Sequence, residues 1–302
     1  MDDRGRSEPP AAVVTAVTDI LSVAPRQWDL RSGGHTRAGK ARAFLPDDTS
    51  VFVKWAEDDR SAALLDELRV LRVVRGSFLP LVVGWSVDPA VVIMEDLSAG
   101  VWPPPYPADI GPLWAALEAK AAVESPAGLP RLEDWAGSKH RWRRVGEHPE
   151  PFLDLGVVSE AWLRTHLEDL IVAEERVSLA GAQLVHNDVF SGNMTFVGGR
   201  AILIDWATAA VGNAWLDTAM AALSLRSEGG PPVRLGFPDE CGFAALLAGH
   251  NALEAAAPLP DWARPDSTLR LEQLVDLRHA LAWAAECLDL PGPDGPGALG
   301  PV

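Results

Sequence analysis

The sequence predicts an α+β protein of two lobes: a small, mainly antiparallel β-lobe that carries one helix, followed by a larger, mainly helical lobe. Its 302 residues are enough for two hydrophobic cores. The first 97 residues contain short β-branched runs separated by turn residues, whereas helical periodicity dominates the remainder. A proline-rich segment at 98–107, SAGVWPPPYP, separates the two parts. We therefore expect an N-terminal lobe at 1–97 and a C-terminal lobe at 98–302.

Five short strands and one helix are expected in the N-terminal lobe. WDLRS and ARAFL flank a glycine-containing turn, and PDDTS supplies the turn between ARAFL and VFVKWA. The helix is expected over 58–76, because Leu64, Leu68 and Leu71 have helical spacing and Gly76 is a stop signal. LPLVVGW and AVVIM then predict two further strands.

Helical periodicity runs through most of the C-terminal lobe, and one β-hairpin interrupts it. The hairpin is expected where NMTFV and RAILID flank the turn Gly198-Gly199. The helices are expected at about 111–123, 130–145, 158–178, 214–226, 239–254 and 267–288.

Charge and composition exclude several classes of function. A net charge of −16 argues against nucleic acid as a partner, and no apolar run approaches the ~20 residues of a membrane span. The N-terminal residues have the wrong charge for a secretory signal, and Cys241 and Cys287 are interpreted as free thiols, so we expect a cytoplasmic protein. Residues 98–302 carry 27 acidic and 14 basic side chains, against 15 and 12 in residues 1–97, so an acid-lined site belongs in the second lobe.

Residues 34–40, GHTRAGK, match the spacing of a phosphate-binding P-loop. A P-loop continues with Ser or Thr and opens a helix, but here Ala41 follows and the next element is a strand. The P-loop interpretation therefore fails, and Lys40 is expected to point to solvent. A glycine-containing hairpin turn can still fold over a triphosphate through its backbone amides.

The segment at 184–206, LVHNDVFSGNMTFVGGRAILIDW, carries the strongest chemical signal. His186, Asp188 and Asn193 form the spacing H-x-D-x-x-x-x-N, and Asp205 follows the predicted hairpin in Ile-Asp-Trp. A tight hairpin returns its end to its start, so Asn193 and Asp205 should be neighbours. One carboxylate and one amide oxygen, with room for phosphates and water, suit Mg²⁺. Asp188 can then lie within reach of a hydroxyl that receives a phosphoryl group.

These residues resemble those of the aminoglycoside phosphotransferase family, the small-molecule branch of the protein-kinase-like fold, and the resemblance covers nearly the whole chain. It implies that Asp188 is the catalytic base and that Asn193 and Asp205 bind the metal. It also implies that His186 supports the catalytic loop and that Asp217, in GNAWLDTA, braces it.

The resemblance extends to nucleotide-binding residues in the N-terminal lobe. Lys54 matches the family lysine that contacts the α- and β-phosphates, and Glu67 matches its glutamate partner, with Asp66 as the alternative. MEDL at 94–97 matches the hinge that holds adenine through its backbone, and the glycine turn would lie over the phosphates of ATP or GTP. The expected contacts are Met94, Glu95, Asp96 and Leu97 in the hinge and Ser32, Gly33, Gly34, His35 and Thr36 in the turn.

Ordinary structural roles remain open for some of these residues. Asp217 could cap the start of a helix, and His35 is typical of a plain turn. KHRWRR at 139–144 suits an anionic ligand or, more readily, a solvated helix face. The chain also has Asn187 where the family commonly has glycine between His186 and Asp188.

The sequence therefore predicts Mg²⁺-dependent transfer of the γ-phosphoryl group of ATP, or of GTP, to a hydroxyl of a small molecule. An antibiotic is the favoured acceptor, with resistance by inactivation as the consequence, and the acidic second lobe favours a cationic one. The alternatives are a metabolite kinase, acting on a sugar, amino alcohol or amino acid, and an inactive nucleotide-binding scaffold. A protein kinase is disfavoured because no A-P-E segment follows Asp205. The sequence indicates no particular oligomeric state.

Overall fold

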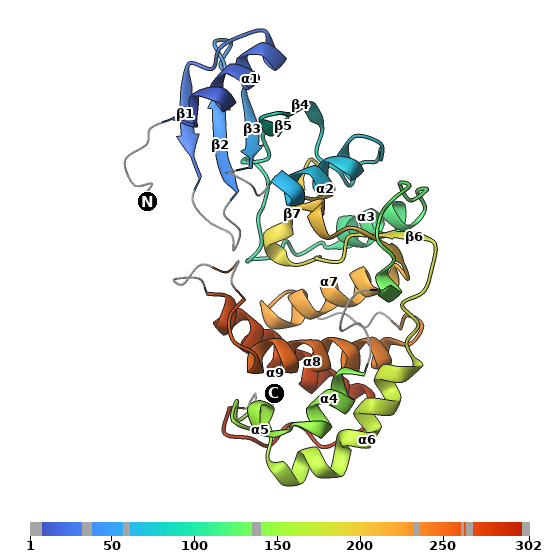
Figure 1. The fold of residues 1–302 in the computed structure, drawn as a ribbon. Coiled ribbons are helices and arrows are strands. Elements are labelled where there is room, and N and C mark those ends of the chain that lie inside the picture. Colours follow the sequence, from blue (N-terminus) through green and yellow to red (C-terminus); the bar gives the residue numbers. More distant parts are fainter. Residues whose placement is uncertain are drawn as a thin grey trace.

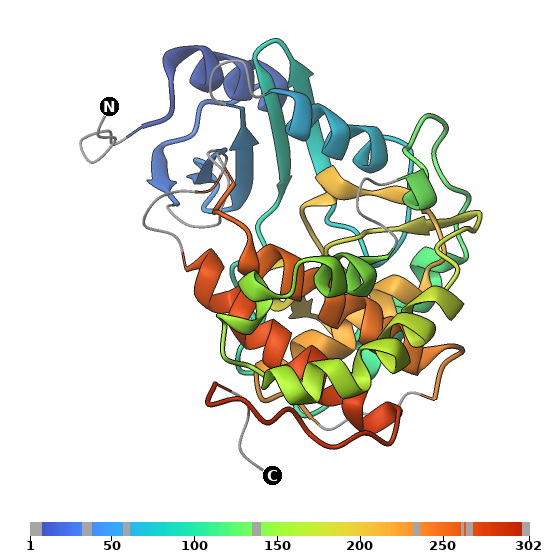
Figure 2. The same ribbon diagram turned by 60° about the horizontal axis from the view of Figure 1, so that its bottom comes forward.

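The computed structural model describes residues 8–31, 38–56, 61–134, 140–231, 236–260, 263 and 268–297. An antiparallel sheet forms one end of the molecule and a group of helices forms the other (Figure 1). The same separation is visible after rotation, with the blue strands at one end and the helices coloured yellow-green to red at the other (Figure 2). The predicted two-lobed α+β fold is confirmed, whereas the boundary at residue 97 stays a prediction.

The side chains of the N-terminal sheet point alternately to its outer face and to its inner face. Its strand order is β1-β2-β3-β5-β4, and every neighbouring pair is antiparallel. Because side chains alternate along a strand, Ala41 and Val53 pack on the outer face, while Lys40 and Lys54 lie on the inner one. The strands are β1 (Gln27–Leu30), β2 (Gly39–Phe44), β3 (Ser50–Trp55), β4 (Val82–Val87) and β5 (Ala90–Glu95).

Two helices flank this sheet, where the sequence predicts one. The expected helix is α2 (Ser61–Leu71), which packs against the inner face beside β5. The additional helix, α1 (Ala11–Leu21), covers the outer face. It buries Val13 and Val17, one helical turn apart. Two buried residues are a weak sequence signal for a helix. Packing against the sheet, and not the local pattern, stabilises α1.

The helices of the C-terminal lobe follow the predicted order, with one correction and one unpredicted addition, the short helix at Glu150–Leu153. The single helix expected over 130–145 is a short 3₁₀ turn at Leu132–Asp134 and a separate helix that starts at Arg141. Within the described residues, no helix has the length and apolarity required to cross a membrane. The helices are α3 (Gly111–Ala121), α4 (Arg141–Glu147), α5 (Glu150–Leu153), α6 (Glu160–Arg176), α7 (Trp215–Ser227), α8 (Glu240–Ala256) and α9 (Leu269–Cys287).

Two small strand pairs position the segment with the chemical signal. The predicted hairpin consists of β7 (Met194–Val197) and β8 (Arg200–Leu203), and both turn glycines have positive φ. Strands β6 (Gln183–Val185) and β9 (Ala210–Gly212) pair beside it. The loop at 186–193 therefore leaves β6 and enters β7, while the loop at 204–209 leaves β8 and enters β9. The two pairs hold the ends of both loops next to each other.

Candidate active site

A cavity of about 540 Å³ lies between the inner face of the sheet and the exit of the β7–β8 hairpin. We call it the interlobe cavity. Strands β2 and β3 supply its cationic side, the segment 94–98 lines another part, and Ile204 and Asp205 lie at its C-terminal side. Its lining residues are Arg31, Lys40, Arg42, Phe52, Lys54, Glu67, Pro80, Met94, Glu95, Asp96, Leu97, Ser98, Trp102, Ile204 and Asp205.

Lys54 joins three elements at this cavity. Its Nζ donates to Glu67 Oε2 at 2.7 Å and to Asp205 Oδ1 at 3.0 Å. Burial alone would lower the pKa of Lys54, but the charges of Glu67 and Asp205 raise it above its ordinary value, so the amine stays protonated. The alternative partner, Asp66, pairs with Arg69 at 3.2 Å on the more exposed side of α2. The structure thus brings Lys54 together with Glu67.

Lys40 lines the interlobe cavity, so the expectation that it points to solvent is wrong. It lies directly opposite Lys54 in the β2–β3 register. Ala41 and Ala43 fill the outer face under α1, and the alternation of the strand therefore turns Lys40 inward. Burial and the nearby charge of Lys54 lower the pKa of Lys40.

The acidic side chains of the hinge already have partners. Asp96 pairs with Arg42, accepts from Ser50 Oγ at 2.5 Å and accepts from the Ser98 amide at 2.9 Å. Glu95 Oε1 accepts from the Leu81 amide at 2.8 Å. These bonds attach segment 94–98 to the sheet.

Asp188 and Asn193 lie together on the loop that enters β7. Asn193 Nδ2 donates to Asp188 Oδ2 at 2.7 Å and to its carbonyl at 3.0 Å. The Ile204 amide donates to the Asn193 carbonyl at 2.9 Å, so the hairpin brings the Asp205 segment against Asn193. Neither Asp188 nor Asn193 is among the residues that line the interlobe cavity.

The oxygen donors near the hairpin fit Mg²⁺. Because Nδ2 of Asn193 faces Asp188, Oδ1 of the same planar amide is turned away from Asp188. Asp205 supplies the carboxylate, and Lys54 holds the pKa of that group below its ordinary value despite burial. No cluster of three or more His, Cys, Asp or Glu side chains suited to a metal occurs among the described residues. A cation here would need phosphate and water oxygens besides Asn193 and Asp205, which is typical of Mg²⁺.

Asp217 holds the start of the loop at 186–193 through two backbone amides of that loop. Its Oδ2 accepts from the His186 amide at 2.7 Å, and its Oδ1 accepts from the Asn187 amide at 2.8 Å. The cap position of α7 is Ala214, so the capping interpretation of Asp217 is wrong. Lys120 Nζ pairs with the Asp217 carboxylate and donates to the Leu184 carbonyl at 2.9 Å, and both charged side chains are fully buried.

Sequence reasoning missed Lys120. The sequence does contain a signal for it. Lys120 lies on the same face of α3 as Leu113, Ala116 and Leu117, which are buried at helical spacing. A lysine on such a face requires a buried partner, and the sequence offers many carboxylates for that role.

His186 packs beneath the surface of the loop at 186–193, in the protein interior, and does not line the interlobe cavity. Its side chain is fully buried, Nε2 donates to the Ile204 carbonyl at 2.9 Å, and its ring packs edge-on against Trp206 at 4.4 Å between centroids. We therefore treat His186 as a positioning residue. It connects the loop at 186–193 to the segment that carries Asp205.

Two residues of the site have left-handed backbone conformations. Asn187 has φ 63° and Asp205 has φ 64°. Among residues with a side chain, Asn and Asp tolerate this region best. Asn187 therefore suits the left-handed backbone of this loop at the position where the family resemblance implies glycine.

The predicted glycine turn lies outside the described residues, and the KHRWRR segment is only partly exposed. The turn residues Ser32, Gly33, Gly34, His35 and Thr36 lie outside the described residues, and so does Lys139. The remainder of KHRWRR is only partly a solvated face, because Arg141 and Trp142 are buried. The Arg141 guanidinium pairs with Glu174 at 3.5 Å, and Arg143 pairs with Glu175 at 2.5 Å.

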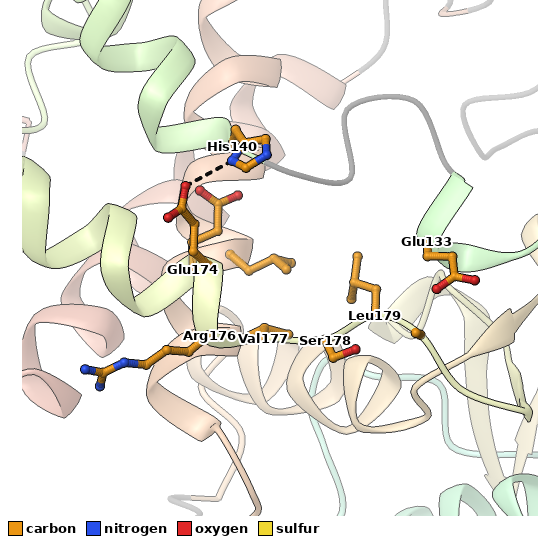
Figure 3. Close-up of a pocket in the computed structure, with 10 residues that line it drawn as sticks. Glu133, His140, Glu174, Arg176, Val177, Ser178 and Leu179 are labelled. Carbon is orange, nitrogen blue, oxygen red and sulfur yellow. Dashed lines mark hydrogen bonds and ion pairs between the residues drawn. The ribbon is translucent and has the colours of Figure 1, made fainter.

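A second cavity, of about 480 Å³, lies at the C-terminal end of α6, where Glu174, Arg176 and Leu179 are among its lining residues (Figure 3). Its acidic side chains have structural partners. Glu174 accepts from the backbone amides of Arg141 and Trp142, each at 3.0 Å, and Glu175 pairs with His140 at 3.0 Å. We assign no chemistry to this cavity.

Comparison with known proteins identifies the family. A model described as the phosphotransferase enzyme family matches residues 42–244. No match was found among curated proteins.

Solved structures with a similar fold include three small-molecule phosphotransferases. An aminoglycoside phosphotransferase from Alicyclobacillus acidocaldarius has a TM-score of 0.56 at 14% identity, covering 95% of this chain and 97% of that one. A spectinomycin phosphotransferase in complex with ADP and spectinomycin has a TM-score of 0.54 at 11% identity, covering 89% and 94%. A choline/ethanolamine kinase family protein from Mesorhizobium loti has a TM-score of 0.54 at 12% identity, covering 86% and 91%. At these identities the likeness establishes the fold.

The Lys120–Asp217 pair should be essential to stability. We expect Lys120→Met to lower the free energy of unfolding by about 3–5 kcal/mol, because it leaves the buried Asp217 carboxylate without its cation. Urea denaturation measures this change. The control Arg164→Met removes an exposed cation and should change stability by less than about 0.5 kcal/mol. Equal stability of Lys120→Met and the unaltered protein would contradict a stabilising role for the pair.

The backbone of Asn187 should tolerate glycine and resist a β-branched residue. We expect Asn187→Val to cost about 1–2 kcal/mol of stability, because a bulky residue is strained at positive φ. Asn187→Gly should lose less, since Oδ1 of Asn187 has no hydrogen-bond partner among the described residues. Thermal unfolding of the two variants measures the difference. If valine and glycine were tolerated equally, φ would not constrain this position.

Proposed function

This chain belongs to the phosphotransferase enzyme family, in agreement with its resemblance to the aminoglycoside phosphotransferases, and from that premise we propose its donor, acceptor class and catalytic residues. The donor is ATP, or GTP, and the acceptor is a hydroxyl group of a small cationic molecule. The observation that carries the proposal is the contact of one lysine, Lys54, with both Glu67 and Asp205 at the edge of the interlobe cavity. A positive charge held by two carboxylates at this cavity supports the proposal, because it suits the phosphates of a nucleotide.

The nucleotide base fits the hinge side of the cavity. Phe52 and Met94 supply apolar surface there, and segment 94–97 supplies backbone groups. The phosphates would then extend toward Lys54 and Asp205. Mg²⁺, held by Asn193 and Asp205, would neutralise charge on the phosphate oxygens. ATP and GTP are cytoplasmic nucleotides, so the reaction belongs in that compartment.

Asp188 is proposed as the base that receives the hydroxyl proton of the acceptor. As the acceptor oxygen bonds to the γ-phosphorus, the bond from that phosphorus to the β–γ bridging oxygen breaks. The electron pair leaves with the nucleoside diphosphate, and the proton passes to the Asp188 carboxylate. Asn193 orients Asp188 through the 2.7 Å bond to Oδ2, and Asp217 holds the loop that carries it.

A group of three carboxylates beside the catalytic loop supports a cationic acceptor. Glu228, Glu272 and Asp276 form this carboxylate cluster, at the end of α7 and on α9. Glu228 Oε1 accepts from Ser191 Oγ at 2.7 Å, and Ser191 lies three residues beyond Asp188. Burial, followed by the charges of Glu228 and Glu272, raises the pKa of Asp276 to about 6. A bound amine would stabilise these crowded negative charges.

Two kinds of cationic acceptor fit this argument. An aminoglycoside or another basic natural product would make the enzyme a resistance factor, whereas an amino alcohol would make it a metabolite kinase. The similar folds include both spectinomycin phosphotransferase and a choline/ethanolamine kinase family protein. An inactive nucleotide-binding scaffold is disfavoured because Lys54, Glu67 and Asp205 remain in contact.

A panel screen tests the proposal. The purified protein is incubated with ATP or GTP, Mg²⁺ and one acceptor from each class: aminoglycosides, basic peptide and nucleoside antibiotics, macrolides, sugars, amino alcohols and amino acids. Mass spectrometry then detects an added phosphate. Phosphorylation of an amine-bearing hydroxyl compound is expected. Preference for a neutral acceptor would refute the cationic assignment, and nucleotide binding without transfer to any acceptor would favour the scaffold.

Asp188 should control turnover and not nucleotide affinity. We expect Asp188→Asn to reduce turnover by about 10²–10⁴-fold, because the amide cannot accept the hydroxyl proton, while ATP affinity stays near that of the unaltered enzyme. Asp205→Ala should instead abolish the metal-dependent activity, and Asn193→Ala should raise the Mg²⁺ requirement. The matched control, Asp66→Asn, removes an exposed carboxylate that pairs with Arg69 and should leave both quantities unchanged. Near-normal turnover in Asp188→Asn would remove Asp188 from the mechanism.

The affinity for a cationic acceptor should depend on pH through Asp276. A carboxyl group with a pKa of about 6 is charged above that pH and neutral below it, so the KM for the acceptor should rise as pH falls. The expected change is about tenfold between about pH 8 and about pH 5, if only the charged form binds. Asp276→Asn should show a high KM with little pH dependence. A pH profile that is identical in enzyme and variant would exclude this role.

A further inference from the structure

We infer that Lys40 is a second phosphate-binding lysine, which contacts the polyphosphate of the bound nucleotide beside Lys54. The inference rests on the proposed function, because it requires a nucleotide in the interlobe cavity. The sequence gives Lys40 no role once the P-loop interpretation has failed, whereas this inference gives it a specific one.

The strand register places the two lysines side by side on one face. Lys40 on β2 is the direct partner of Lys54 on β3, and both line the interlobe cavity. Directly opposite side chains on paired strands have Cβ atoms about 4.5–5.5 Å apart. Two amines in this arrangement can reach neighbouring phosphate groups of a single nucleotide.

The electrostatic surroundings of Lys40 differ from those of the other cations in the cavity. Arg31 pairs with Asp29 at 2.7 Å, Arg42 pairs with Asp96, and Lys54 has two carboxylate partners. Within the described part of the chain, no carboxylate lies within salt-bridge distance of Lys40 Nζ. Glu67 and Asp205 act on Lys40 only through longer-range attraction, while Lys54 repels it.

Like charges directly opposite each other on a sheet are destabilising, and burial of one of them adds to the cost. The lowered pKa of Lys40 reflects the same cost. An anion with several charges, placed between the two amines, would replace this repulsion with charge-assisted hydrogen bonds. Lys40 thus supplies a cationic group without a salt-bridge partner among the described residues, which a polyphosphate could pair with.

The composition of the chain argues against a nonspecific role for Lys40. The sequence has 22 arginines and only four lysines, so arginine is its usual surface cation. The lysines in the described residues are Lys40, Lys54 and Lys120, and the latter two are buried and tied to the catalytic machinery. A compact ammonium fits beside Lys54 where a planar guanidinium would need more room.

Direct titration of nucleotides tests the inference without any acceptor. Isothermal calorimetry measures the affinities of ATP, ADP and adenosine for the full chain and for Lys40→Met. We expect the variant to bind ATP and ADP about 10–100-fold more weakly, the loss expected for a hydrogen bond to a charged group, and to bind adenosine unchanged. Lys40→Arg should restore part of the lost ATP affinity, because it keeps the charge.

Arg26→Met is the matched control. It removes a half-exposed cation that pairs with Asp48 on the same lobe, and it should leave all three affinities unchanged. Unchanged ATP and ADP affinities in Lys40→Met, with weaker binding in Lys54→Met, would overturn the inference and leave the proposed function intact. Absence of nucleotide binding by the unaltered protein would instead overturn the proposed function.

Adenosine affinity also reports whether each variant keeps the cavity. If Lys40→Met does not fold, Lys40→Gln provides the same comparison with a polar, uncharged side chain. Equal losses for adenosine and ATP in that variant would show a structural role, and would contradict phosphate contact.

Discussion

The buried carboxylate of Asp217 is the constraint on which the geometry of the loop at 186–193 depends. It accepts hydrogen bonds from two consecutive backbone amides, those of His186 and Asn187, and pairs with Lys120. A buried charge without a partner is expensive, so each member of this group requires the others. The loop therefore leaves β6 along one path, and that path requires a left-handed conformation at Asn187. Asp188 is the next residue in the chain, so the bonds that fix His186 and Asn187 also fix the position of Asp188.

Electrostatic pairing organises the interlobe cavity in the same way. Lys54 connects the sheet, α2 and the exit of the hairpin, because its partners Glu67 and Asp205 come from the latter two. The hinge is attached to the sheet through Asp96, which contacts Arg42 and Ser50. These bonds preorganise the cavity before any ligand enters, which limits the reorganisation that phosphoryl transfer would require.

Much of this architecture could be predicted from local sequence patterns. The five strands, α2, the β7–β8 hairpin and most later helices follow from periodicity and turn residues. Helix α1 could not be predicted in this way, because its buried face consists of few residues and its stability comes from the sheet. The single helix expected over 130–145 also failed, because periodicity does not reveal that His140, with φ 61°, precedes the first turn of α4.

The sequence by itself determined the chemistry: the spacing of His186, Asp188 and Asn193, followed by Asp205, indicates phosphoryl transfer, since chain spacing across a hairpin fixes which side chains meet. Only the tertiary structure decided which charges pair. Lys120 and Asp217 are 97 residues apart, and Lys54 and Asp205 are 151 apart. Nothing in a local pattern selects one carboxylate among 42 as the partner of a buried lysine. The tertiary structure also decided which way the Lys40 side chain points. Ala41 and Ala43 are buried under α1, so the alternate side chains of β2, including Lys40, face the cavity.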